Sequence, residues 1–264
     1  MAPLGLGAGF YSLGPTLSAG EAVHVGQVDG NYMVVPTGAN ALDLGANFQS
    51  TIRGSFTFAT YFYGSAVTNT KGSAYLLSAL GDATNNDYLK LGINGDGKTE
   101  IGFKANNDPF VQFSASDEFI GARATGWRHI AFVITKNSSA DTTAVVYVDG
   151  TAVTLASAYG GQTMNDTNHG GYDGHGSFNA LLGNFPSATG NNRALMKHSA
   201  IWSSALDAAN IVEIHGAGIS TPLNLTSASG NYDTQGDLVG YWKLTEGSGT
   251  TATDTTGNSN GTIV

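Results

Sequence analysis

Carboxylate side chains come first, because a pair held at a fixed separation supplies the acid and the nucleophile or base of sugar-hydrolysing enzymes. The glutamates of this chain are isolated from one another, at Glu21, Glu100, Glu118, Glu213 and Glu246. The sequence also lacks the Gly-x-Ser-x-Gly turn of serine hydrolases and the His-Glu-x-x-His pair of zinc proteases. We therefore expect no catalytic centre and a protein that is not an enzyme.

A run of oxygen-bearing side chains near the C-terminus has the composition of a calcium loop. Asp254, Asn258 and Asn260 are separated only by small residues. Ca²⁺ takes six to eight oxygen ligands from carboxylates, amides and backbone carbonyls. Asp29 and Asn31 would complete the coordination sphere if the two ends of the chain meet. The alternative is an Asx- and Gly-rich turn, which needs no metal.

A second polar segment, residues 160–177, carries two histidines and an aspartate that could bind a transition metal. A Gly-rich loop holds ligands imprecisely, however, and no fourth ligand follows at a convincing spacing. Contact with a glycan or another subunit is the better interpretation, because a tyrosine ring can stack while amides and a carboxylate form hydrogen bonds. The contact residues would be Asn165, Asn168, His169, Tyr172, Asp173 and His175. Glycan or subunit contact is thus favoured over a metal site, but a solvated loop without any ligand remains the favoured interpretation of this segment.

Composition argues against several kinds of partner. The net charge is −9 at pH 7, which argues against nucleic acid and anionic membranes because both reward a basic surface. No apolar run approaches the ~20 residues that cross a bilayer, so we expect no membrane insertion. There is no cysteine for disulfides or thiolate chemistry. The first basic residue is Arg53, so the N-terminus lacks the basic region of a secretory signal.

The clearest structural pattern surrounds residues 129–135, where every second side chain is a large apolar one. A period of two over this length predicts a β-strand. Two further strands are expected over 143–148 and 151–155. Asp149-Gly150 between them suits a type I′ turn, because both central residues need positive φ. We expect three consecutive antiparallel strands close to the centre of a sheet.

The rest of the chain predicts short strands separated by turns. They are expected over residues 41–45, 55–63, 75–80, 88–93, 99–103, 110–113, 178–182 and 194–202. This spacing favours an antiparallel β-sandwich over a parallel sheet. One short helix should follow, with Ser204 and Asp207 as a capping box and Gly216 just past its end. Three tryptophans on apolar strands are expected to anchor the core, namely Trp127, Trp202 and Trp242.

Two segments carry a resemblance to a known family. Residues 126–150, GWRHIAFVITKNSSADTTAVVYVDG, and 198–218, HSAIWSSALDAANIVEIHGAG, resemble the laminin G-like, pentraxin-like branch of the concanavalin A-type jelly rolls. The resemblance implies an all-β antiparallel sandwich with one short helix. The loop 254–261 also resembles this family's calcium loop, with Thr256 where serine is usual. The family includes lectins, adhesion modules, enzyme-appended domains and virion proteins, so it implies fold more than activity.

The order of segments departs from the family. Residues 238–264 resemble the stretch that normally opens such a domain, yet here they close the chain. Because the termini of a sandwich often lie close together, we expect residues 239–244 to pair beside the N-terminal strands. This would make residues 21–264 one circularly permuted jelly-roll domain, preceded by an N-terminal arm or docking segment, residues 1–20. The alternative is donation of a strand to a neighbouring subunit.

Three short stretches also resemble virion proteins of tailed bacteriophages: MAPLGLG at the start, NFQSTIRGSF at 47–56 and LVGYWKL at 238–244. This resemblance implies a non-enzymatic virion structural protein, either a capsid decoration protein or a tail or fibre component. Such a protein would assemble in the host cytoplasm, contact other virion proteins and its own copies, and adhere to host surface polysaccharide. The alternatives are a freestanding calcium-dependent lectin and a polysaccharide-active enzyme.

Overall fold

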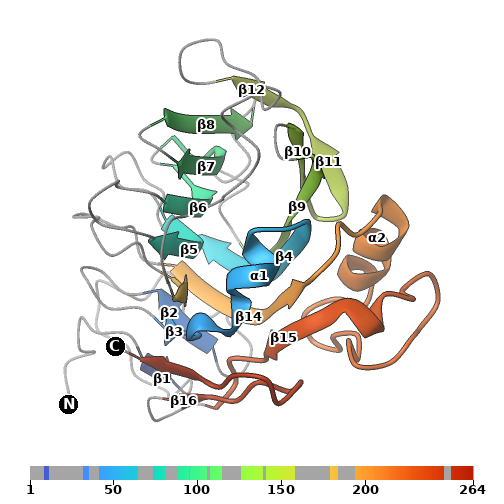
Figure 1. Ribbon diagram of the computed structural model, residues 1–264. Helices are drawn as coiled ribbons and strands as arrows, with labels where there is room; N and C mark the ends of the chain where they lie inside the picture. The colour runs from blue at the N-terminus through green and yellow to red at the C-terminus, as the bar shows by residue number, and fades with distance from the viewer. Residues whose placement is uncertain are drawn as a thin grey trace.

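Two antiparallel β-sheets pack face to face in the computed structural model of the protein (Figure 1). The structure describes residues 9–11, 32–35, 42–64, 74–80, 88–94, 96–105, 108–114, 126–138, 141–157, 179–183, 194–246 and 251–263. The predicted all-β sandwich is confirmed. In the described part of the chain, no helix is long and apolar enough to cross a membrane.

Sheet A has eight described strands, all paired antiparallel. From one edge to the other they are β1 (Gly9–Tyr11), β2 (Tyr32–Val35), β14 (Ala194–Trp202), β4 (Phe56–Gly64), β9 (Arg128–Ser138), β10 (Asp141–Val148) and β11 (Thr151–Val153), with β15 (Leu238–Trp242) also paired to β14. The long strand β14 has neighbours on both sides, so it and β4 occupy the middle of the sheet.

Sheet B has nine described strands. In order they are β12 (Leu155–Ser157), β8 (Asp108–Ser114), β7 (Thr99–Ala105), β6 (Tyr88–Ile93), β5 (Ala74–Leu80), β13 (Ala180–Leu182), β3 (Leu42–Asp43), β17 (Gly261–Ile263) and β16 (Thr251–Ala252). The helical elements are η1 (Ala46–Phe48), α1 (Gln49–Ile52), α2 (Ala208–Gly216) and η3 (Gln235–Asp237).

The alternation of β9 decides how the two faces of sheet A are used. Its large apolar side chains lie in the core between the sheets: Ile130, Phe132 and Ile134. Phe132 stacks on Phe58 of β4, with ring centroids 6.4 Å apart. The alternate residues Ala131 and Val133 are also buried, but in a second cluster on the opposite face. Sheet A is therefore covered on both sides, as the mostly apolar second face of this strand requires.

The hairpin of β10 and β11 has the predicted turn but not the predicted position in the sheet. Asp149 and Gly150 have φ of 49° and 75°, so the type I′ turn is confirmed. The prediction that all three strands lie near the centre of a sheet is wrong, because β11 forms the edge of sheet A. The chain leaves this sheet at Val153, and Leu155 already begins β12 in sheet B.

The helix α2 exists as predicted, but both of its caps differ. Its N-cap is Asp207 rather than Ser204, because the Asp207 carboxylate accepts a hydrogen bond from the backbone N–H three residues on, at 2.8 Å. At the other end, Gly216 is still helical. Gly218 takes the positive φ, 77°, and its N–H donates to the carbonyl of His215 at 2.9 Å. Both predicted caps are therefore wrong in position, because the N-cap is Asp207 and the glycine with positive φ is Gly218.

The C-terminal segment pairs with strands of both sheets within its own chain. In β14, residues 194–196 pair with β2 and residues 199–202 pair with β15. In sheet B, β17 pairs with β3, so the strand predicted over 41–45 lies inside the sheet, between β13 and β17. Circular permutation of the family's order stays a prediction. Of the expected arm, residues 9–11 form β1, and the other residues of 1–20 lie outside the described part.

Trp242 should be one of the strongest single contributors to stability. Its side chain is fully buried, meets Phe48 edge to face at 5.4 Å, and donates from Nε1 to the carbonyl of Ser259 at 3.1 Å. We expect Trp242→Ala to lower the free energy of unfolding by about 3–5 kcal/mol. Urea unfolding followed by circular dichroism measures this. Val145→Ala, at a site 39% exposed on β10, is the control and should change stability by less than about 0.5 kcal/mol.

Candidate functional site

The carboxylate of Asp254, predicted as a calcium ligand, is buried and fully engaged by hydrogen bonds from the protein. Oδ1 accepts from the backbone N–H groups of Tyr241 and Thr256, each at 2.9 Å. Oδ2 accepts from the backbone N–H groups of Asn258 and Ser259, each at 3.0 Å. It also accepts from the Thr256 hydroxyl at 2.7 Å. The carboxylate thus organises the loop and ties it to β15.

The other predicted metal ligands do not form a cage around an ion. Asn258 donates from Nδ2 to the carbonyl of Val239 at 3.0 Å, and Oδ1 of Asn260 accepts from the N–H of Asp254 at 3.0 Å. Asp29 and Asn31 lie outside the described residues. Within the described part, no three His, Cys, Asp or Glu residues gather as metal ligands would. N–H and O–H donors surround the Asp254 carboxylate, as the metal-free turn requires. Calcium binding is not tested by this arrangement and stays a prediction.

The loop predicted to contact a glycan or a subunit lies outside the described residues. This applies to all six of its predicted contact residues: Asn165, Asn168, His169, Tyr172, Asp173 and His175.

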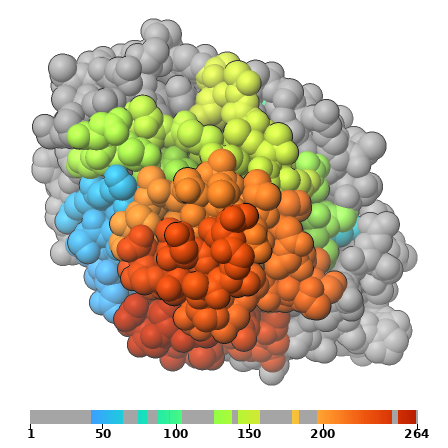
Figure 2. Space-filling model, turned by 90° about the vertical axis from the view of Figure 1, so that its right-hand side faces the viewer, coloured from blue at the N-terminus to red at the C-terminus, as the bar shows by residue number. Residues whose placement is uncertain are grey.

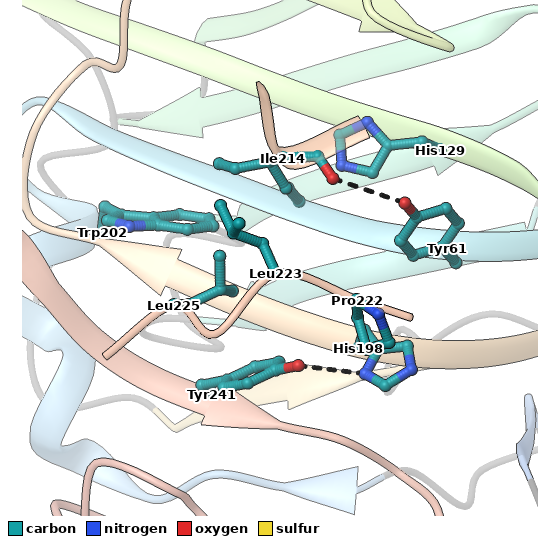
Figure 3. A pocket seen from close by; sticks show the side chains of 10 residues that line it. Tyr61, His129, His198, Trp202, Ile214, Pro222, Leu223, Leu225 and Tyr241 are labelled. Atoms are coloured by element: carbon teal, nitrogen blue, oxygen red, sulfur yellow. Dashed lines mark hydrogen bonds between the residues drawn. The ribbon is translucent and has the colours of Figure 1, made fainter. Parts of the chain in front are cut away.

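The C-terminal layer, by which we mean residues 203–237 including α2, forms the face seen in Figure 2. A small cavity lies beneath it, on the outer face of sheet A (Figure 3). Its volume of about 10 Å³ is close to the minimum for one water molecule, so it cannot admit a sugar. The lining residues are Ala59, Tyr61, His129, His198, Trp202, Ile214, Pro222, Leu223, Leu225 and Tyr241.

The polar groups of this cavity are held neutral by burial. His198 sits in a β-bulge of β14 with a positive φ of 52°, and its Nδ1 lies 3.0 Å from the hydroxyl of Tyr241. Burial, followed by the charges of Lys197 and Lys243, lowers the pKa of His198 to about 4. Burial likewise raises the pKa of Tyr241. The backbone strain at His198 therefore serves a buried contact between two neutral side chains.

A charged and aromatic cluster lies on the opposite side of the sandwich, on the outer face of sheet B. Lys90 of β6 and Glu100 of β7 form an ion pair, with Nζ and Oε1 3.3 Å apart and side chains 18% and 6% exposed. The Lys90 ammonium also lies 4.8 Å from the ring centre of Tyr88 and 5.6 Å from that of Tyr75. Burial lowers the pKa of Lys90, but Glu100 and both tyrosines outweigh it, so the net pKa is raised.

Strand register builds this Lys–Glu–Tyr cluster. Buried leucines of β6 face the core, which places Tyr88 and Lys90 on the outer face. Lys90 pairs with Gly102 of β7. A Cβ at Gly102 would lie 2.7 Å from Cε of Lys90, so the lysine stem needs the glycine in order to lie flat across the strand. The ammonium then reaches Glu100, two residues along β7 and on the same face.

Sequence reasoning did not identify this cluster. The alternation within residues 88–91 places Tyr88 and Lys90 on one face, and that signal was available. The pairing of β6 with β7, which brings Glu100 to the lysine, depends on the register between strands. The approach of Tyr75 depends further on a register shift between β5 and β6. Neither shift nor register is written in local residue patterns.

Comparison with known proteins gives a family and a set of similar folds. No curated protein sequence matches the chain. A family model described as the concanavalin A-like lectin/glucanases superfamily matches residues 36–212. One similar structure is a Bacteroides ovatus protein assigned provisionally to carbohydrate binding. It has a TM-score of 0.52 and 16% identity over 86% of this chain and 59% of that one.

Two further structures have lower TM-scores. The CBM40 module of a Ruminococcus gnavus sialidase, bound to α2,6-sialyllactose, has a TM-score of 0.44 and 11% identity, over 66% of this chain and 93% of that one. A sialidase from Trypanosoma rangeli has a TM-score of 0.44 and 14% identity, over 79% of this chain and 32% of that one. At these identities the likeness concerns the fold alone.

Replacing Asp254 separates the turn from a calcium site. We expect Asp254→Ala to lower the free energy of unfolding by roughly 3 kcal/mol, because buried backbone donors lose their acceptor. If the loop is a turn, the loss is the same in calcium and in chelator. Thermal unfolding of the variant and the wild type under both conditions measures this. A loss confined to the calcium-containing samples would instead establish a metal site.

Proposed function

Because this chain belongs to the concanavalin A-like lectin/glucanases superfamily, we propose that it is a carbohydrate-binding protein without catalytic activity. The observation that carries this proposal is the Lys–Glu–Tyr cluster on the outer face of sheet B. Its two tyrosines are partly exposed, and its ion pair is only slightly exposed. Such a site offers a solvent-facing aromatic surface beside fixed charges.

The chemistry of the Lys–Glu–Tyr cluster matches what a sugar presents. Tyrosine rings give a flat apolar surface on which the C–H face of a pyranose can pack. A lysine ammonium only donates hydrogen bonds, and a carboxylate only accepts them. In an ion pair, the ammonium can therefore donate to one sugar hydroxyl while the carboxylate accepts from a neighbouring one. Charge-assisted hydrogen bonds of this kind are about twice as strong as neutral ones.

Binding is favoured over hydrolysis by the spacing of carboxylates. Glycosidases need two carboxyl groups roughly 5–10 Å apart. Among strand residues with described side chains, the other carboxylate on this outer face is Asp43 of β3, four strands away from Glu100. Neighbouring strands are about 4.8 Å apart, which puts the two roughly 19 Å apart along the sheet. The Glu100 carboxylate is also paired with an ammonium.

A panel of neutral and acidic bacterial polysaccharides tests the proposal. We expect binding by the full chain, weakened at least tenfold by Tyr88→Ala and by Lys90→Met, which corresponds to about 1.4 kcal/mol each. Lys90→Arg keeps the charge and should retain more of the affinity than Lys90→Met. Melting temperatures of all variants separate lost binding from lost folding.

Val145→Ala, on the other sheet, is the control and should bind as the wild type does. Absence of binding throughout the panel would contradict the proposed function. Binding that survives both substitutions would contradict the proposed site while leaving the function intact. The same panel in chelator tests whether binding requires calcium.

The virion role remains a second prediction, supported by sequence resemblance. Two of the three stretches that resemble virion proteins also help to build the fold. Residues 47–56 include α1, residues 238–244 include β15, and Phe48 and Trp242 from these stretches pack against each other. Shared packing is therefore an alternative explanation of the resemblance. Mass spectrometry of purified phage particles is the test, and absence of the protein from them would contradict a virion role.

A further inference from the structure

The C-terminal layer packs on the outer face of sheet A, which is the face turned away from sheet B (Figures 1 and 2). Its apolar side chains, among them Ile211 and Leu225, join those of the sheet in a single buried cluster. Hydrogen bonds also cross this interface, among them the following two. Nε1 of Trp202 donates to the hydroxyl of Tyr232 at 3.0 Å, and the hydroxyl of Tyr61 donates to the carbonyl of His215 at 3.3 Å.

His129 of β9 lies at the centre of this interface (Figure 3). Its side chain is 1% exposed. Its ring centre lies 5.1 Å from that of Tyr61 on β4 and 5.7 Å from that of His215 on α2. Nδ1 of His129 is buried without a hydrogen-bond partner, and the same holds for Nδ1 of His215. A second imidazole therefore faces His129 from the layer.

Among the described residues, the charged groups near His129 offer its ring no hydrogen-bond acceptor. Asp149 accepts from the backbone N–H of His129 through Oδ1, at 2.9 Å, and pairs with Arg128 through Oδ2. On β14, Lys197 pairs in register with Tyr61, so the nearest charge on that strand is positive. A proton on the His129 imidazole would thus create a buried cation in the closed form. The described rings beside it belong to a tyrosine and a second histidine, which do not compensate the charge, so protonation there is costly.

We propose that the C-terminal layer is an acid-sensitive cover, whose separation from sheet A is coupled to protonation of His129. The proton binds after α2 separates from the strand and water reaches the imidazole ring. Opening exposes the aromatic outer face of sheet A, including Tyr61 and Trp202. The cover works independently of any glycan site on sheet B.

The direction of the pH dependence follows from linkage. Burial, followed by the neighbouring His215, lowers the pKa of His129 from 6.5 to about 3. The open form therefore binds the proton more tightly than the closed form. The closed form has its full stability above pH 6.5 and loses it as the pH falls towards about 3. Each pH unit in this window favours opening by up to tenfold, or about 100-fold at pH 4.5.

Hydrogen–deuterium exchange of the full chain, corrected for the intrinsic effect of pH, tests the cover. Between pH 7 and pH 4.5 we expect protection of the amides in residues 207–216 to fall about 100-fold. Protection in β5, β6 and β7 should fall far less, because these strands lie in the other sheet. Equal loss in both regions would mean acid unfolding of the whole domain and would overturn the proposal, as would constant protection.

Two variants identify the group that takes up the proton. His129→Gln keeps a neutral polar side chain and should reduce the change in the helix to less than threefold. His215→Gln removes the facing imidazole but leaves His129, so most of the pH dependence should remain. An unchanged response in His129→Gln would assign the effect elsewhere, with His198 the next group, since its pKa is also lowered. If His129→Gln does not fold, the wild-type comparison of the two sheets still decides.

Discussion

Sheet A has two apolar faces, and the architecture of the second half of the chain follows from the need to cover both. A strand such as β9, with Phe132 on one side and Ala131 and Val133 on the other, cannot leave either face in water. Sheet B covers the first face. The second is covered by the C-terminal layer, which anchors through Ile211 and Tyr232. The layer therefore forms a second buried apolar cluster with sheet A, separate from the core between the two sheets.

The same requirement accounts for the C-terminal strands. Along one side of β14, β2 pairs with residues 194–196 and β15 pairs with residues 199–202. Without β15, residues 199–202 would lack a backbone partner on that side. Without β17, β3 would be an open edge of sheet B. Asp254 holds this arrangement by collecting donors from β15 and from its own loop. A buried carboxylate that accepts five hydrogen bonds needs no cation for stability. The turn alone is thus one sufficient reason for this loop composition, and calcium binding stays a prediction.

Local patterns predicted what is local, and they were wrong where distant segments decide. Alternation placed β9 and β14 within a few residues, and the Asp149-Gly150 pair predicted its turn. The place of the hairpin at a sheet edge depends on which strands reach β14 from elsewhere. The N-cap is Asp207 and not Ser204 because residues 203–206 connect β14 to the helix. In this connection the backbone N–H of Leu206 donates to the hydroxyl of Thr57. Register, which created the Lys–Glu–Tyr cluster, has no local signal at all.

The two outer faces of the sandwich solve the problem of buried polar groups in different ways. On sheet B, Lys90 and Glu100 compensate each other, so the charges remain and can take part in recognition. On sheet A, no described residue offers the His129 ring a compensating charge, so the closed form requires this histidine to be neutral. One face therefore keeps a permanent polar site beside aromatic rings, and the other keeps its aromatic rings hidden under a removable layer.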